Sequence, residues 1–363
     1  MSMRSTLSAN RMHVLQAGLV LVLALACVFV LTLPARVTTA AGIVRYTITT
    51  PLVWLRDQPS LIASSTYPVY KGEFYTVIAR SNDSVWVELA TGAEKDAGTW
   101  IMTNLGVVTQ GKLSDAPVPL TLDVVHPYHR AIYYPDWIPT ITADQKAIYR
   151  GSVDYAKDLH MFTVVGDCNS LPPVYLQRVA AGQFDVTDYT GLGWVADRFT
   201  PSFTRISLAV NGGFNAAAMS DSDWADHALC DKNVGPFACE VWVSRASVIF
   251  IEVGTGDQYE WKDFEKNYRP LVEHALKKGV LPVLVTKADD LEARNGAPSG
   301  YINSVIRTLA DEYNVPLLDF WQATRALPNN GLINEGGLNF HLSQAGQDMH
   351  LVATLQTLDA ISR

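Results

Sequence analysis

The sequence predicts an α/β protein in which a helix-covered parallel sheet follows a small all-β domain and an apolar N-terminal segment. From residue 160 onward, short apolar runs alternate with longer amphipathic runs, which is typical of a parallel sheet with helices on both faces. Residues 43–108 instead show short alternating runs punctuated by turn residues, with no helical period. An apolar stretch over residues 14–33, broken only lightly by Gln16, Gly18 and Thr32, precedes both regions.

The N-terminal apolar stretch sets the expected compartment. Residues 14–33 are as long as a membrane-spanning helix needs to be and longer than the core of a signal peptide. Arg4 and Arg11 precede the stretch, so the positive-inside rule leaves the rest of the chain outside the cytoplasm. We therefore predict that residues 1–41 form a signal anchor in the cell membrane. The small residues at 38–41 leave open a cleavage site, and the protein would then be secreted.

Composition narrows the expected partners. The net charge of −8 argues against nucleic-acid binding, which would require a basic surface. A cell-wall or surface glycan or peptide is expected instead, with the membrane contacted through the N-terminal segment. The sequence predicts no cofactor and no metal site. Asp289, Asp290 and Glu292 are interpreted as an exposed acidic loop rather than a cation site.

The cysteines agree with an exported protein. Cys230 and Cys239 lie close together in a loop-like stretch, so a disulfide between them is expected in an oxidising compartment. Zinc binding is the less favoured alternative, because no second Cys or His pair has ligand spacing. Cys27 lies in the apolar N-terminal stretch, and Cys168 is left as the free thiol of the exported region.

The all-β domain is predicted to occupy residues 42–110. Its segments 53–59, 70–73, 85–88 and 98–101 together resemble a bacterial SH3-like (SH3b) barrel. Such a module could bind cell-wall peptides, or it could act only as a spacer between the membrane and the main domain. The expected strands are 43–50, 53–56, 74–80, 85–89 and 99–102.

A linker over residues 111–159 follows. Its frequent prolines exclude a continuous helix over its first half, and its aromatic residues are expected to pack on the next domain. A helix is predicted over 142–156, with Thr142 as its cap and Gln145 completing a capping box.

The main domain is predicted to cover residues 160–363. In a doubly wound sheet, the functional site lies at the carboxyl ends of the strands. The expected strands are 161–165, 205–210, 247–253, 280–286 and 317–320, and the expected helices are 173–181, 264–278, 301–313 and 343–361.

The first expected strand of this domain ends in Gly166-Asp167-Cys168. Together with three later blocks, this turn resembles the SGNH/GDSL hydrolase family, whose own turn reads Gly-Asp-Ser. The resemblance implies a flavodoxin-like fold for residues 160–363 and places Cys168 at the position of the nucleophilic serine. It also implies that Gly166 and Asp167 support the turn.

Two middle blocks correspond to the family's oxyanion donors. In the second block the resemblance makes Gly213 the first choice for a backbone donor, and a shifted alignment would place Ala216 there. The third block reads Gly254-Thr255-Gly256-Asp257, where the family has Gly-x-Asn-Asp. Gly256 therefore stands where the family has a side-chain amide.

The last block resembles the family's Asp-x-x-His. It places His341 at the position of the catalytic base and Leu338 at that of the orienting acid, which a leucine cannot replace. Glu335 and Asn339 are residues of the same loop that could partly substitute.

Cys168, Gly256 and Leu338 are three departures from one catalytic site. They favour a non-catalytic surface protein that binds a glycan, peptide or protein in the former cleft. The alternative is an acyl-ester hydrolase or transferase that uses a Cys168–His341 dyad on acyl groups of surface polysaccharide, with a depressed thiol pKa. A structural protein built on the SH3-like module is a third possibility.

Overall fold

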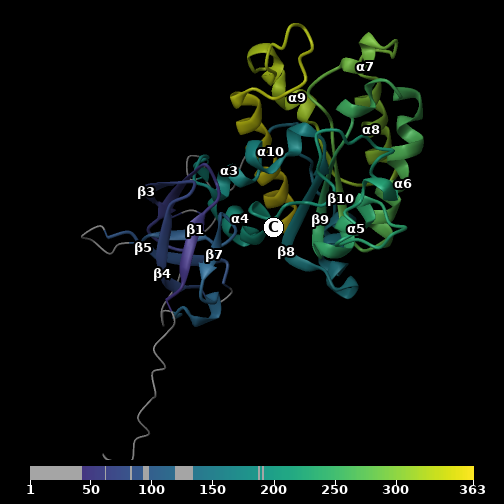
Figure 1. The fold of residues 1–363 in the computed structure, drawn as a ribbon. Coiled ribbons are helices and arrows are strands. Elements are labelled where there is room, and N and C mark those ends of the chain that lie inside the picture. The colour runs from purple at the N-terminus through teal and green to yellow at the C-terminus, as the bar shows by residue number, and fades with distance from the viewer. Residues whose placement is uncertain are drawn as a thin grey trace, which may run out of the picture. The chain divides into compact units, whose positions relative to one another are not determined.

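The computed structural model describes residues 43–61, 63–81, 84–92, 98–118, 134–186, 189 and 192–363. The segment Ile43–Arg363 forms one compact unit, shown in Figure 1. The predicted anchor over 1–41 and the middle of the predicted linker lie outside the described residues. No helix of the described part of the chain has the length and apolarity to cross a membrane.

The first part of this unit is a seven-stranded antiparallel sheet in the order β3-β2-β6-β5-β4-β1-β7. The five strands expected from the sequence are present. The additional strands, β3 and β7, lie at the two edges of the sheet, where mostly exposed side chains give no alternating pattern. The resemblance to an SH3-like barrel stays a prediction. The strands are β1 Arg45–Ile48, β2 Leu52–Arg56, β3 Ser65–Tyr70, β4 Phe74–Arg80, β5 Trp86–Ala90, β6 Trp100–Met102 and β7 Gly106–Gln110.

The helix expected at the end of the linker is α2, Ala143–Gly151. Thr142 caps it by accepting a hydrogen bond from the backbone N–H of Gln145, and the Gln145 side chain accepts from the backbone N–H of Thr142. The predicted C-terminal extension to residue 156 is a 3-10 turn, Ser152–Tyr155.

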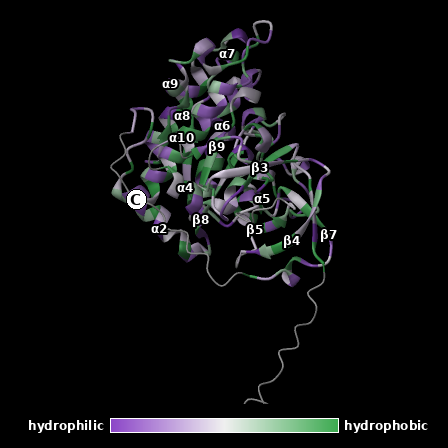
Figure 2. Ribbon diagram, turned by 90° about the vertical axis from the view of Figure 1, so that its left-hand side faces the viewer, coloured by the Kyte–Doolittle hydropathy of each residue, from purple (hydrophilic) through white to green (hydrophobic). Residues whose placement is uncertain are grey.

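The second part is built on a four-stranded parallel sheet in the order β11-β10-β9-β8. The strands β9 and β10 are wholly buried and β8 is buried over its C-terminal half, as expected when both faces are covered, and Figure 2 shows hydrophobic residues in this region. The strands are β8 Asp158–Gly166, β9 Ala246–Glu252, β10 Leu281–Val285 and β11 Leu317–Leu318.

The strand predicted over 205–210 was wrong. The segment makes only one parallel bridge, between Val210 and Gly166. The backbone N–H of Leu208 donates instead to the Glu240 carboxylate, and that of Ala209 donates to its neighbour Ser207, so no regular ladder forms. The segment still lies beside β8, which gives the spatial order of a doubly wound sheet with its switch point next to β8.

Helices cover both faces of the parallel sheet (Figure 1). Apolar residues of α5, α6 and α8 pack on one face, and those of α3, α4 and α10 pack on the other. The Ser343 cap expected for the last helix accepts a hydrogen bond from the backbone N–H of Gly346. The helices are α3 Gln177–Ala180, α4 Gly193–Arg198, α5 Pro236–Val243, α6 Phe264–Lys277, α7 Leu291–Arg294, α8 Tyr301–Glu312, α9 Phe320–Thr324 and α10 Gln344–Ser362.

Hydrogen bonds join the antiparallel sheet to the helices on the α3 side. The guanidinium of Arg56, at the end of β2, donates to the carbonyl of Val179 at 3.0 Å and to the carbonyls of Leu61 and Ala63. The backbone N–H of Trp54 donates to the carbonyl of Ala181 at 3.0 Å. Arg56 is buried, so these contacts are part of the packed core.

Candidate active site

The turn after β8 holds the candidate nucleophile. A Cβ atom at Gly166 would lie 2.2 Å from the Ser170 hydroxyl oxygen, so only glycine fits at the end of this strand. Asp167 is buried, and its carboxylate accepts the backbone N–H of Asn169 at 3.1 Å. Cys168 begins a short 3-10 turn, Cys168–Ser170, at the carboxyl end of β8. The roles of Gly166 and Asp167 in supporting a catalytic turn stay predictions.

Asn169 links this turn to the loop that carries His341. Its side-chain amide donates to the carbonyl of Phe340 at 2.9 Å, and its side-chain oxygen accepts the backbone N–H of Leu342 at 3.0 Å. These two bonds flank His341 on both sides. Asn169 therefore ties the residue next to Cys168 to the residues next to His341, a role for which the sequence offers no signal.

The imidazole of His341 contacts the carboxylate of Glu335. The two carboxylate oxygens of Glu335 lie 2.8 and 3.0 Å from Nδ1 of His341. Leu338, at the expected position of the acid, is exposed. Gly336 and Gly337 have φ angles of 65° and 93°, which let the loop turn back so that Glu335 reaches the imidazole.

The backbone N–H of Gly213, the predicted oxyanion donor, already has a hydrogen-bond acceptor. That N–H donates to the side-chain oxygen of Asn211 at 3.0 Å. Gly212 lies nearer the nucleophile, since a Cβ added there would be 3.8 Å from the Cβ of Cys168. The second block therefore does lie beside the Cys168 turn, although the role of Gly213 stays a prediction.

Gly256 lies where no side chain fits. A Cβ added to it would be 2.4 Å from the carbonyl oxygen of Phe214 and 3.3 Å from the Cβ of Asn215. Asn215 accepts the backbone N–H of Ala218 with its side-chain oxygen, and its amide nitrogen has no hydrogen-bond partner among the described residues. A side-chain amide is therefore present next to Gly256, but it comes from the second block.

A buried carboxylate, that of Asp257 in the third block, holds the second block in place. Both oxygens of Asp257 accept the backbone N–H of Ala216, at 3.1 Å each. Burial, together with the negative charge of the nearby Asp167, raises the pKa of Asp257 to about 7 against the hydrogen bond donated by the backbone of Ala216. Burial likewise raises the pKa of Asp167 to about 6, against the hydrogen bonds donated by the backbones of Asn169 and Thr255.

The surroundings of Cys168 favour its neutral thiol. Burial, followed by the negative charge of Asp167, raises its pKa to about 12. The activated thiolate expected for a Cys168–His341 dyad is therefore not what the site stabilises. The physical reason is the Asp167 carboxyl, which lies 3.8 Å from the sulfur of Cys168, together with the removal of the thiol from water.

The serine two residues after Cys168 is held in a buried hydrogen-bond network. Ser170 is buried and donates to the Glu252 carboxylate at 2.5 Å. The same carboxylate lies 3.0 Å from Nε2 of His350, whose ring stacks on Tyr175. Residues of this network and of the turn together line a small cavity: Ser170, Glu252, His350, Asp167 and Asn169.

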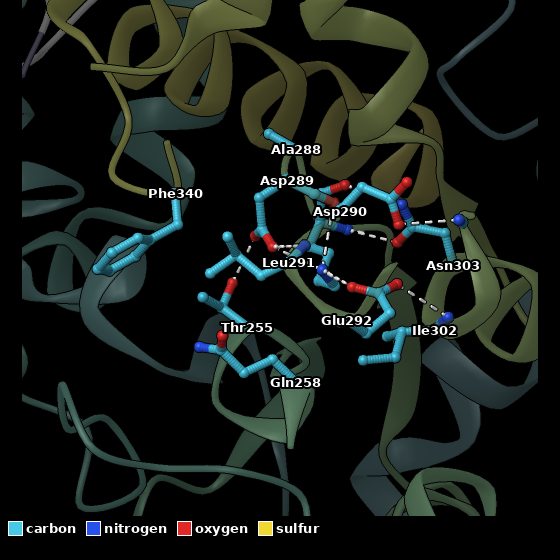
Figure 3. Close-up of polar contacts among 12 residues, drawn as sticks. Thr255, Gln258, Ala288, Asp289, Asp290, Leu291, Glu292, Ile302, Asn303 and Phe340 are labelled. Atoms are coloured by element: carbon cyan, nitrogen blue, oxygen red, sulfur yellow. Dashed lines mark hydrogen bonds and ion pairs between the residues drawn. The ribbon is translucent and has the colours of Figure 1, made fainter. Parts of the chain in front are cut away.

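The acidic residues after β10 form a buried ion-pair cluster, drawn in Figure 3. Asp289 and Glu292 are buried, and each accepts a bond of 2.6 Å from the ammonium of Lys287. Asp289 also accepts the hydroxyl of Thr255 at 2.7 Å, which supports the third block. The exposed acidic loop expected here was wrong for these two residues, because Lys287 compensates their charge. Within the described ranges, no group of His, Cys, Asp and Glu could hold a metal ion.

The expected disulfide between Cys230 and Cys239 is present, with Cα atoms 5.6 Å apart. It closes the loop in front of α5. Cys168 is the free cysteine of the described residues.

Residues 179–349 match the GDSL-like Lipase/Acylhydrolase family. The match includes the two oxyanion blocks and the block of His341, and it begins after the turn with Cys168. This domain is GDSL hydrolase-like. No curated protein matches the chain.

Several solved structures are similar to the chain. A G-D-S-L family protein from Desulfitobacterium hafniense DCB-2 has 15% identity and a TM-score of 0.36, and the match covers 55% of this chain and 99% of that one. A catalytic mutant of Axe2, an acetylxylan esterase from Geobacillus stearothermophilus, has 15% identity and a TM-score of 0.38, with 55% and 93% covered. LAE5, an α/β hydrolase from the metagenome of Lake Arreo, has 15% identity and a TM-score of 0.39, with 57% and 98% covered.

Proposed function

We propose that this chain is an acyl-ester hydrolase or acyltransferase in which Cys168 is the nucleophile, His341 the general base and Glu335 the orienting acid. The observation that carries the proposal is the pair of short contacts between Glu335 and Nδ1 of His341. A carboxylate only accepts hydrogen bonds, so it favours the tautomer with the proton on Nδ1. Nε2 is then left free to take a proton from a nucleophile.

In the proposed reaction the thiol loses its proton only as it attacks. His341 Nε2 takes the proton of Cys168 while the sulfur bonds to the ester carbonyl carbon. The tetrahedral intermediate then expels the alkoxide, which receives that proton from His341, and a thioester remains. Water or a sugar hydroxyl, deprotonated by His341, attacks the thioester, and Cys168 leaves as the thiol. General-base catalysis suits a thiol whose pKa is raised to about 12.

Asn215 is the proposed side-chain donor to the oxyanion. Its free amide nitrogen and its place beside Gly256 support this role, since Gly256 stands where an amide would be expected. The donor would thus have moved from the third block to the second. Losing one such donor typically costs 10²–10³-fold in rate.

The expected setting is the cell surface, with acyl groups on a surface polysaccharide as substrate. The apolar stretch before the described residues and the disulfide in the main domain support an exported enzyme. We propose attachment to the membrane through residues 1–41, with the C-terminal domains outside the cytoplasm.

The test is ester turnover by the purified full-length protein on p-nitrophenyl acetate and an O-acetylated oligosaccharide. Cys168→Ala should abolish turnover. Glu335→Gln should lower kcat at least tenfold, and by up to about 10⁴-fold, because the neutral amide no longer fixes the imidazole tautomer. Glu260→Gln, at another exposed glutamate, is the matched control and should change nothing. Turnover that survives Cys168→Ala would overturn the proposal.

A second candidate is a non-catalytic binding protein for a surface glycan, peptide or protein. The raised pKa of Cys168 and the missing side chain at Gly256 favour it. It predicts no turnover on any ester, together with ligand binding that Cys168→Ala leaves intact. Measurable turnover lost in Cys168→Ala would exclude it.

A further inference from the structure

A second cavity lies at the other end of the parallel sheet from Cys168. Its volume is about 350 Å³, which falls in the range of small-molecule sites. Lys157 comes just before β8, Trp242 lies at the end of α5 before β9, and Lys278 follows α6 before β10. In a parallel sheet all three therefore lie at the amino ends of the strands. Cys168 follows the carboxyl end of β8, roughly 30 Å away along a nine-residue strand.

Basic side chains dominate the polar lining of this cavity. Lys157, His274 and Lys278 line it, and none of them forms an ion pair with a described carboxylate. Asp231 is the acidic residue of the lining. On a chain with a net charge of −8, the two lysines of this cavity outnumber its one carboxylate, which is a local excess of positive charge.

Lys157 has N–H donors that no described residue accepts from. Its ammonium donates to the carbonyl of Val241, one of the last carbonyls of α5, and this uses one of its three protons. Burial lowers the pKa of Lys157, and the positive charges of Lys278 and Arg245 lower it further. Burial and neighbouring lysines also lower the pKa of His274. An anion in the cavity would relieve this repulsion.

Two exposed aromatic rings stand at the same cavity. The Trp242 side chain is 73% exposed and that of Tyr155 is 57% exposed, although both line the cavity. The ring of Tyr155 packs directly on Gly279, where an added Cβ would lie 2.2 Å from it. Cys239, held in the disulfide, forms part of the wall. The cavity is therefore largely pre-formed, which lowers the entropy cost of binding.

We propose that this cavity binds an acidic sugar unit of a polysaccharide, with its carboxylate between Lys157 and Lys278 and its ring against Trp242. The two lysines supply charge-assisted hydrogen bonds to a carboxylate. The flat apolar face of a tryptophan suits the apolar face of a pyranose ring. A neutral sugar would leave the ammonium groups unpaired, and an isolated small anion would leave the tryptophan uncovered.

The test is affinity electrophoresis and titration calorimetry of the full-length protein with oligogalacturonate, and with dextran as the neutral probe. We expect retardation by oligogalacturonate and none by dextran. Trp242→Ala and Lys278→Gln should each raise the dissociation constant about tenfold or more, equivalent to about 1.4 kcal/mol or more. Ester turnover is not a readout, so this test is independent of the proposed catalysis.

Two matched controls separate the cavity from general surface charge. Lys277→Gln removes the neighbouring lysine of α6, which does not line the cavity, and Trp224→Ala removes another exposed tryptophan. Both should bind like the wild type. Equal weakening by Lys277→Gln and Lys278→Gln would overturn the proposal, as would absent binding or binding that Trp242→Ala leaves unchanged. Displacement of oligogalacturonate by inorganic phosphate, with no effect of Trp242→Ala, would indicate an anion site and not a sugar site.

Discussion

Cys168 shows how a single side chain depends on its surroundings. A cysteine beside a histidine is usually read as a reactive thiolate, because an adjacent positive charge lowers the thiol pKa. Here burial and the Asp167 carboxyl have the opposite effect and raise that pKa to about 12. In the proposed reaction the thiol therefore needs a base during attack, as a serine hydroxyl would.

This gives the first prediction. Cys168 in the folded protein should react with iodoacetamide at pH 7 at least tenfold more slowly than glutathione, because only the thiolate alkylates and its pKa is raised. The rate should keep rising above pH 9. Mass spectrometry of the peptide containing Cys168 measures it, and the urea-unfolded protein is the control. Labelling at pH 7 faster than that of glutathione would contradict the raised pKa.

Gly256 carries a second residue-scale prediction. Gly256→Asn would restore the amide expected from the sequence resemblance, but its Cβ would collide with the carbonyl oxygen of Phe214. We expect a loss of about 1–3 kcal/mol in the free energy of unfolding and no gain in turnover. Gly213→Ala, whose Cβ would meet nothing closer than 3.7 Å, is the control for stability. Urea denaturation measures both, and an Asn variant as stable as the wild type would show that the turn can move aside.

At the scale of elements, the site depends on hydrogen bonds that join one turn to another. Asp257, in the 3-10 turn Thr255–Gln258, holds the second block through the backbone N–H of Ala216. Asn169 holds the loop of His341. In each case a polar side chain forms a hydrogen bond with a backbone group that is far away in the sequence. Such pairings leave no periodic pattern in the sequence.

Asp257 gives a prediction about pH. Its pKa in the folded protein is raised to about 7, so the folded state binds this proton more tightly than the unfolded chain does. The contribution of Asp257 to stability is therefore fully present below about pH 4 and is lost as the pH rises to about 7. Asp257→Asn cannot titrate. The difference in unfolding free energy between wild type and variant should fall between pH 4 and pH 7 and stay level above, as measured by urea denaturation. A difference that rises with pH would contradict the raised pKa.

Secondary structure could be predicted from the sequence where the apolar residues follow the pattern of a buried strand or of an amphipathic helix. The predictions of β8, β9 and β10 and of α6, α8 and α10 come close to the observed bounds, because a buried strand is uniformly apolar and a covering helix is apolar on one stripe. The segment 205–210 reads as a strand by composition but makes a single bridge, because Glu240 takes one of its backbone N–H groups. Short elements such as α7 and α9 are below the length at which a period can be read.

At the scale of the whole molecule, Arg56 joins the antiparallel sheet to the α/β part. It is buried, and its guanidinium donates to three carbonyls, one of them in α3. Arg56→Ala should lower the free energy of unfolding by on the order of 3 kcal/mol, because buried carbonyls lose their partner. Arg45→Ala, at an exposed arginine of β1, should change it by less than about 0.5 kcal/mol. Thermal unfolding measures both variants. An Arg56→Ala variant that melts at the same temperature as Arg45→Ala would show that Arg56 does not couple the two parts.

The sequence by itself determined the order of the elements, the disulfide and the position of the Cys168 turn at a strand end. These follow from local patterns, because hydrophobic period, turn residues and cysteine spacing act over short stretches. Only the tertiary structure decided that the Glu335 carboxylate contacts Nδ1 of His341, that Asn215 lies beside Gly256, and that the surroundings of Cys168 raise its pKa. The physical reason is that hydrogen bonds, burial and charge act through space, between groups whose separation along the chain carries no signal.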